Sequence, residues 1–237
     1  MAGSDRRERI RRAGADVSVS DGRIAGREPA IGQAPGDLRT LQAFVNTLDI
    51  EQGTDALSSP ADLDRWLRQA GLVTAPGDKS QQRELSLAIE LREALRDVLR
   101  SHVTRRTITG TQRQLAASRG IDAQAADIHD SDDGAAGTRV ARVAAAMRAG
   151  IDVGADGRIR IVPADAGARA ALTRLLLIGA EAATAGTWTR LKVCSADDCQ
   201  WAFYDRSPTH SGCWCSMQIC GSRAKSRAYR SRSARTG

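Results

Sequence analysis

The stretch Cys194-Ser-Ala-Asp-Asp-Cys199, together with Cys215-Ser-Met-Gln-Ile-Cys220, decides how the C-terminal part of the chain folds. Four residues separate the cysteines of each pair, and fifteen residues lie between the pairs. Two such pairs can place four sulfurs at the tetrahedral corners that Zn²⁺ prefers, in a segment too short to bury its own core. Four thiolates leave no coordination position for water, so we expect Cys194, Cys199, Cys215 and Cys220 to hold a structural zinc ion.

Two further residues near the pairs are candidate ligands. Cys213 lies two residues before Cys215, too close for both thiols to occupy easy corners of one site. We favour a bystander thiol at Cys213 over a redox partner that attacks a zinc-bound neighbour. His210 lies between the pairs and could replace one sulfur, but four well-spaced thiols favour the all-cysteine set.

Two disulfides in a secreted protein are the alternative to a metal site. The five cysteines are an odd number gathered in one stretch, and no apolar signal segment follows Met1. The longest apolar run, residues 175–180, is too short to span a bilayer. We therefore expect a cytoplasmic protein with reduced cysteines and no membrane partner.

The segment after the last cysteine is strongly basic. Residues 221–237 contain six basic side chains and no acidic one: Arg223, Lys225, Arg227, Arg230, Arg232 and Arg235. Residues 194–237 contain seven basic and three acidic residues, a net charge of +4 against +7 for all 237 residues. A zinc module with a basic extension is typical of nucleic-acid binding. Only three of the 35 basic residues are lysines, a bias that a GC-rich genome also produces, so charge alone is weak evidence.

We expect the basic segment to be a helix that starts near Ser222. Its spacing places Arg223, Arg227 and Arg230 on one face. One of these arginines could read a guanine edge, while Lys225 and Arg232 would contact phosphates. The alternative is a charged strip that binds without sequence preference.

These residues resemble the CGNR-type zinc finger. The resemblance rests on the cysteine spacing, on Trp201, Phe203 and Trp214, and on the run Cys220-Gly-Ser-Arg223. Ser222 stands where the family has asparagine, and Cys213 stands where a basic residue usually precedes the Trp-Cys pair. Serine is a good helix N-cap, so the substitution is compatible with a helix start at this point.

The rest of the chain predicts a mainly α fold with a short β-hairpin. We expect helices that begin near Asp37, Ser59 and Ser80, and two more over residues 139–148 and 168–185. Residues 130–137 have the composition of a flexible loop, and residues 151–162 have the pattern of a hairpin. Residues 1–36 contain few large apolar side chains and predict a disordered tail.

The helical part resembles the ABATE domain of stress-induced transcription regulators. The resemblance rests on Phe44-Val-Asn-Thr47, on Leu57-Ser-Ser-Pro60 with Trp66, and on Leu91-Arg-Glu-Ala-Leu-Arg96. It implies a helical domain over residues 37–187 that precedes a zinc finger over residues 188–237. Asn46, Thr47 and Arg92 could line an effector pocket, although capping and bridging of helices is the commoner use of such residues.

Together these observations favour a zinc-dependent transcriptional regulator that binds double-stranded DNA. The helical domain would then sense a signal or form a homodimer. The alternative is an RNA-binding or ribosome-associated zinc protein. No P-loop, nucleophile elbow or paired histidines for catalytic zinc occur, so we expect no enzyme activity. His102 and His129 are interpreted as helix-surface and loop residues.

Overall fold

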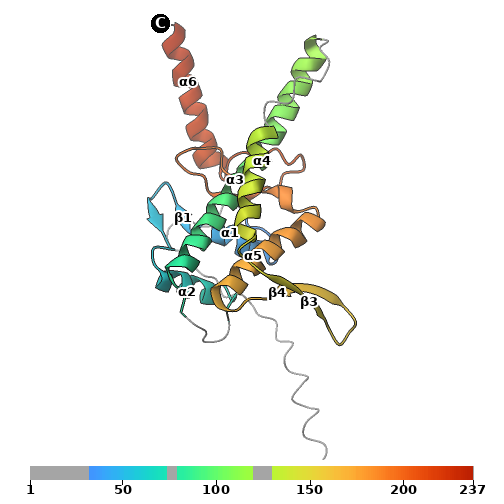
Figure 1. Ribbon diagram of the computed structural model, residues 1–237. Coiled ribbons are helices and arrows are strands. Elements are labelled where there is room, and N and C mark those ends of the chain that lie inside the picture. Colours follow the sequence, from blue (N-terminus) through green and yellow to red (C-terminus); the bar gives the residue numbers. More distant parts are fainter. Residues whose placement is uncertain (1–31, 74–78, 120–129, 237) are drawn as a thin grey trace, which may run out of the picture.

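The computed structural model describes residues 32–73, 79–119 and 130–236 (Figure 1). The helices are α1 (Leu38–Val45), α2 (Pro60–Gln69), α3 (Gln82–Arg119), α4 (Asp130–Ala144), α5 (Gly167–Thr184) and α6 (Ser222–Thr236). Three antiparallel two-stranded sheets join β1 (Leu48–Asp49) to β2 (Thr54–Asp55), β3 (Ala149–Val153) to β4 (Ile159–Pro163), and β5 (Leu191–Val193) to β6 (Ala202–Tyr204). The mainly α class, the hairpin over 151–162 and the basic C-terminal helix are confirmed.

The starts of the first two helices differ in how they are capped. Ser59 caps α2 as predicted, because its Oγ accepts a hydrogen bond from the Asp62 amide at 3.2 Å and Pro60 occupies the first turn. Asp37 precedes α1 as expected but makes no side-chain cap. Its carboxylate instead accepts a hydrogen bond from Arg174 of α5 at 2.9 Å, so the start of α1 is tied to a neighbouring helix.

Helices α3 and α4 extend beyond their predicted limits. Helix α3 continues sixteen residues past Val103, to Arg119. The predicted loop over residues 130–137 is wrong, because these residues form the first half of α4. Helix α4 packs along α3, and its Ala136 is buried. Packing against a neighbouring helix thus overrides the weak helix propensity of Asp and Gly in this segment.

One hydrophobic core joins the helices to the sheet that precedes the cysteines. Buried residues of α1, α2, α3 and α5 form most of it, and Trp66 packs on Phe44 with ring centroids 5.4 Å apart. Leu191 and Val193 of β5 and Ala202 of β6 belong to the same core. The domain boundary between residues 187 and 188 stays a prediction. Buried side chains on both sides of it belong to one hydrophobic core.

Amide side chains of α1 hold strand β6 in place. Asn46 donates from Nδ2 to the Ala202 carbonyl at 3.0 Å and accepts from the Ala202 amide at 2.7 Å. Gln42 donates from Nε2 to the same carbonyl at 3.1 Å, and to the Gly32 carbonyl at 3.1 Å. Asn46 therefore completes the hydrogen bonding of a buried strand edge, which supports the structural use of this side chain.

Side chains of α3 make a second set of bonds to the C-terminal part. Arg96, whose side chain is only 2% exposed, donates to the Val45 carbonyl at 2.8 Å and to the Gln200 carbonyl at 3.0 Å. His102 is buried rather than on the helix surface, and its Nδ1 lies 2.8 Å from the Leu191 carbonyl. His129 lies outside the described residues. Helix α3 is thus bonded to both ends of the β5–β6 unit.

The other two polar residues of the ABATE-like motifs also bind within the fold. Arg92 makes a two-pronged contact with the Asp55 carboxylate at 2.7 and 2.9 Å, and its Nη1 lies 3.2 Å from the Thr47 hydroxyl. Thr47 donates in turn to the Phe44 carbonyl at 2.8 Å. These bonds attach the β1–β2 hairpin to α3 and support the bridging use of these side chains.

The last residues of the predicted tail are packed on the body of the molecule. Ala34 is fully buried, and its amide donates to Gln42 Oε1 at 2.7 Å. The Tyr204 amide donates to the Gly32 carbonyl at 2.8 Å, so this segment lies along β6. Residues 1–31 lie outside the described part of the chain. None of the helices in the described ranges combines the length with the apolar composition that a membrane span requires.

Replacing Asn46 with alanine should destabilise the whole protein. The change removes two hydrogen bonds and leaves the buried Ala202 amide without its acceptor, at a cost of about 1–3 kcal/mol in the free energy of unfolding. Chemical denaturation followed by circular dichroism measures this. The control is Gln52→Ala, which removes an exposed amide side chain. Equal stability of the two variants would contradict the bridging role of Asn46.

Candidate metal centre

The four predicted cysteines converge at one point beside the β5–β6 sheet. Cys194 directly follows β5, Cys199 lies in the connection to β6, and Cys220 lies in the π-helical turn Met217–Gly221 that leads into α6. All four ligand atoms lie within 4.8 Å of one another, and all four residues are buried. The structure therefore brings together the full set that the spacing predicts.

The sulfur positions fit a tetrahedral ion. Zinc–sulfur bonds of about 2.3 Å require neighbouring sulfurs about 3.8 Å apart in a regular tetrahedron. The Sγ atoms of Cys199 and Cys215, and those of Cys215 and Cys220, are both 3.7 Å apart. None of the five cysteines forms a disulfide bond. The donor set thus has the chemistry and the size of a structural four-thiolate zinc site.

The close approach of the four thiols shifts their pKa values in opposite directions. Hydrogen bonds from Cys199 and then Cys215 lower the pKa of Cys194, whereas hydrogen bonding to Cys194 raises the pKa of Cys215. Burial, followed by the charge on Cys194, raises the pKa of Cys220. The protein alone therefore stabilises a thiolate at one corner and disfavours it at others. A divalent cation would remove this conflict, because it stabilises all four thiolates.

Apolar side chains enclose the sulfurs. Phe203 and Ala196 form a small buried cluster with the cysteines, and Trp201 and Trp214 pack against it. Phe203 lies opposite Lys192 in the β5–β6 register. Successive residues of a strand face opposite sides, so Phe203 faces the sulfurs while Ala202 and Tyr204 face the helical core.

The two other candidate ligands stay outside the sulfur cluster. Cys213 is half-buried, and its carbonyl accepts a hydrogen bond from the Ser195 amide at 2.9 Å. Burial, followed by the charge on Cys194, raises the pKa of the Cys213 thiol, which favours the bystander interpretation. His210 adopts a positive φ of 51°, and its carbonyl accepts a bond from Lys192.

A buried ion pair holds the loop between the two cysteine pairs. Lys192 Nζ donates to Asp205 Oδ2 at 2.7 Å, to the His210 carbonyl at 2.5 Å and to the Gly212 carbonyl at 3.1 Å. Asp205 also accepts bonds from the amides of Ser207 and Gly212 at 2.9 and 2.8 Å. The Lys192 and Asp205 side chains are 1% and 4% exposed. All three ammonium hydrogens are thus used, as a buried lysine requires.

Lys192 was not predicted from the sequence as a residue of the site. The sequence did contain a hint of a buried lysine. Lys192 is one of three lysines in an arginine-rich chain, and it lies between the apolar residues Leu191 and Val193. Burial alone would raise the pKa of Asp205, but the bonds from Lys192 and Ser207 outweigh it and hold that pKa below its usual range. Asp205 therefore stabilises the fold at neutral pH, and this contribution is lost as the pH falls below about 4.

The basic helix is joined directly to the last cysteine. Ser216 caps the Met217–Gly221 turn by accepting a hydrogen bond from the Ile219 amide at 3.3 Å. Ser222 is already helical, with φ −66° and ψ −41°, so the expected cap at Ser222 is replaced by one at Ser216. Cys220 thus lies in a helical run that continues into α6, and its sulfur fixes where that helix begins.

Two of the predicted nucleic-acid contacts have acidic neighbours. Arg223 donates to Glu51, in the β1–β2 hairpin, at 2.8 Å. Arg227 Nη1 lies 3.8 Å from Asp198, in the first cysteine loop. The two arginine side chains are 45% and 48% exposed, so water weakens both pairs.

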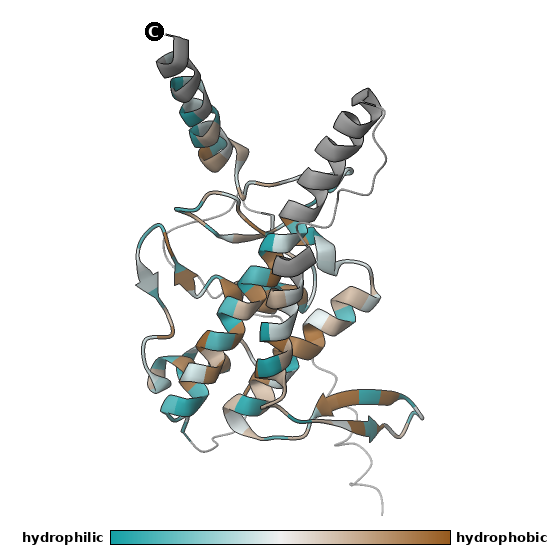
Figure 2. Cartoon of the chain, turned by 45° about the horizontal axis from the view of Figure 1, so that its top comes forward, coloured by the Kyte–Doolittle hydropathy of each residue, from teal (hydrophilic) through white to brown (hydrophobic). Residues whose placement is uncertain are grey.

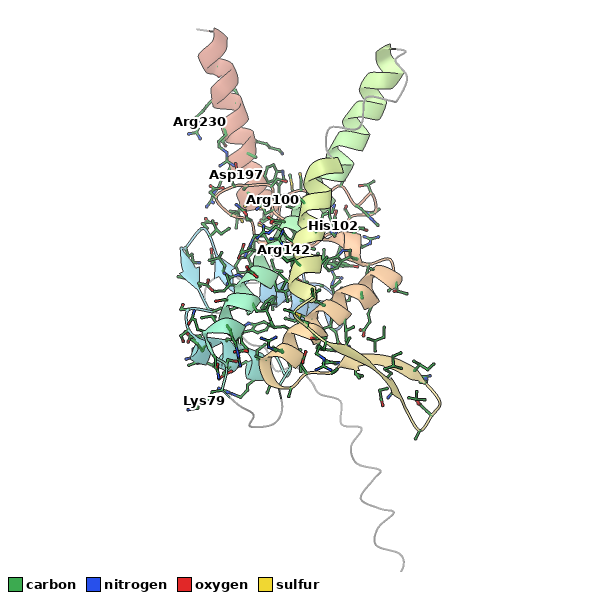
Figure 3. The ribbon with its side chains drawn as sticks, in the orientation of Figure 1. Lys79, Arg100, His102, Arg142, Asp197 and Arg230 are labelled. Carbon is green, nitrogen blue, oxygen red and sulfur yellow. The ribbon has the colours of Figure 1, made fainter. Side chains whose placement is uncertain are left out.

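The remaining basic residues of α6 lie between these two arginines or farther along the helix. Lys225 and Arg230 are exposed, and Figure 3 shows Arg230 directed away from the body, above Asp197. The side chain of Arg232 lies outside the described residues. Helix α6 itself projects beyond the body of the molecule (Figure 1).

Replacing Asp205 with asparagine should lower the free energy of unfolding by about 3–5 kcal/mol, because it leaves the buried Lys192 ammonium without its counter-charge. Thermal or urea denaturation of zinc-loaded protein measures this. The matched control is Asp197→Asn in the same module, where the side chain is exposed and the change should stay within about 0.5 kcal/mol. Similar losses in both variants would contradict the role of the buried pair.

Comparison with known families agrees with this geometry. A family model described as "Putative stress-induced transcription regulator" (ABATE) matches residues 38–210, and one described as "CGNR zinc finger" matches residues 190–233. The two matches overlap across strands β5 and β6, which contribute to both hydrophobic clusters. A comparison with curated proteins finds no match. Since the first match spans well over half of the chain, the protein belongs to the ABATE family and carries a CGNR zinc finger in its C-terminal part.

Proposed function

We propose that this protein is a cytoplasmic transcription regulator whose zinc finger binds double-stranded DNA through α6. Cys194, Cys199, Cys215 and Cys220 hold the structural zinc ion. The helical domain senses a signal or mediates association with another copy. We assign no catalytic residue.

The observation that carries the proposal is the position of α6. Helix α6 contains six basic residues and no acidic one, and it projects from the body as a helix of fifteen residues. An α-helix of this kind fits the major groove of DNA, where side chains reach base edges while others contact phosphates. The clustered positive charge supplies the salt-dependent part of the affinity.

Zinc has an orienting role in this proposal. Cys220 lies in the helical run that leads into α6, and Arg223 follows it by three residues. A metal bound by the four sulfurs would fix the helix start relative to β5 and β6, which are embedded in the helical core. The ion would then determine the direction in which α6 leaves the protein, without taking part in any reaction.

The proposed DNA-contacting arginines of α6 fall into two groups: those paired with an acidic residue near the start of the helix, and those beyond these acids. Arg223, Arg227 and Arg230 share one face, and the first two lie beside Glu51 and Asp198. DNA phosphates would have to replace these exposed pairs, which are weak. Arg230 lies beyond both acids and is our preferred base-reading residue, while Lys225 and Arg232 would contact phosphates.

The alternative function is RNA binding, and the positions of the aromatic side chains disfavour its single-stranded form. Phe203 is buried beside the sulfurs, and Trp201 and Trp214 pack against the same cluster half-buried, which reduces the surface they offer for stacking on bases. Tyr229, 67% exposed, remains available on α6. Recognition of single strands normally uses several exposed aromatic platforms.

Arg230→Ala should weaken the binding of zinc-loaded protein to duplex DNA roughly five-fold or more, and should relax the preference for one base pair at the position that Arg230 contacts. Fluorescence anisotropy with duplexes that differ at single base pairs measures both effects, and structured RNA as a competing ligand tests the alternative function. The charge-matched control is Arg158→Ala, whose side chain is 81% exposed in the β3–β4 turn, far from α6.

Glu51→Gln provides a check of opposite sign, because removing the carboxylate frees Arg223 for phosphate and should strengthen DNA binding. Equal affinities of wild type, Arg230→Ala and Arg158→Ala would place the interface elsewhere. Preference for RNA over duplex DNA would support the alternative function.

A further inference from the structure

The β3–β4 hairpin presents a continuous apolar face to solvent. In its register Ile151 lies opposite Ile161, and Val153 lies opposite Ile159. Residues two apart on a strand, and residues directly opposite, share one face of the sheet. These four side chains therefore form one patch, and their exposed fractions are 76%, 60%, 64% and 71% in the order named. Figure 2 shows the apolar strands of this hairpin extending from the body.

The opposite face of the same hairpin is polar. Asp152 lies opposite Arg160, and their charged atoms approach to 3.9 Å. Arg160 also donates to Asp156 in the turn at 3.2 Å. The hairpin thus has the alternation of a strand pair with one solvated and one covered face, but among the described residues nothing covers the apolar face.

A hairpin whose apolar face is exposed to solvent is unusual in a folded protein. A two-stranded hairpin alone is only marginally stable in water, and it normally needs a further sheet or helix on its apolar side. The four residues expose on the order of 500 Å², a size at which a patch on a monomer is often an interaction site. The other exposed large apolar residues, Met217, Ile219 and Tyr229, lie in or beside α6.

We propose that this apolar face packs against the same face of a second copy of the chain, across a two-fold axis. A two-fold interface requires a patch that complements itself, and a face of β-branched side chains without charge meets this requirement. Two such faces would bury on the order of 1,000 Å² in total, close to the lower limit for a specific interface. The expected dimer is therefore reversible, with a dissociation constant in the micromolar range.

The position of the hairpin is compatible with DNA binding. It extends from the end of the molecule opposite α6 (Figure 1), so association through it leaves both basic helices uncovered. The dimer itself does not depend on the proposed function, and its test contains no nucleic acid, so the two can fail separately.

Sedimentation velocity of the full-length, zinc-loaded protein, from low to high micromolar concentration, tests the proposal. Wild type should shift from monomer to dimer over this range. The double variant Ile151→Thr/Ile161→Thr keeps β-branched residues in the strands but removes half of the apolar patch. Its dissociation constant should rise about ten-fold or more.

The matched control places the same two residues on the other face, as Asp152→Thr/Arg160→Thr, in the adjacent cross-strand pair. This variant should dimerise like wild type, and circular dichroism should show all three proteins equally folded. A wild type that stays monomeric throughout, or equal association of the two double variants, would overturn the proposal. A monomeric wild type would leave the face to another protein or to a lipid surface.

Discussion

Strands β5 and β6 pack on two sides, against the helical core on one face and against the sulfur cluster on the other. Leu191, Val193, Ala202 and Tyr204 face the helical core, while Phe203 faces the sulfurs. A strand alternates its side chains between two faces, so six residues can serve two interiors at once. The zinc finger is therefore not attached to the helical domain through a linker. Its β5–β6 sheet packs directly against the core of that domain.

Polar side chains hold the β5–β6 sheet in place on both of its faces. Asn46 and Arg96 satisfy buried backbone groups on the helical side, and Lys192 with Asp205 holds the loop between the cysteine pairs on the other. Each group is costly to bury alone but is fully bonded here. Such networks favour one arrangement, because a shifted strand would leave several buried groups unbonded. The direction of α6 then follows from the sulfur cluster that β5 and β6 support.

The sequence predicts local features well and long-range ones poorly. The zinc site was predictable because ligand spacing is a local property, and so was the α2 cap formed by Ser59 and Pro60. The length of α3 and the helical state of residues 130–137 were not, since packing between α3 and α4 overrides local composition. Asp37 lies at the predicted cap position, but its carboxylate accepts a hydrogen bond from Arg174 and does not cap α1. The role of Lys192 could not be predicted, because it depends on one carboxylate and two carbonyl oxygens that only the fold brings together.

Hydrogen exchange of the zinc-loaded and zinc-depleted protein, followed by mass spectrometry, tests most directly whether the metal site and the helical core are one unit. Metal removal should reduce amide protection in β5 and β6 and, by a similar free energy, in α1 and the central part of α3. Reloading with zinc should restore protection in all of them. Full protection of α1 and α3 after metal removal, with loss confined to the cysteine loops and α6, would show instead that the metal site and the helical core are separate units.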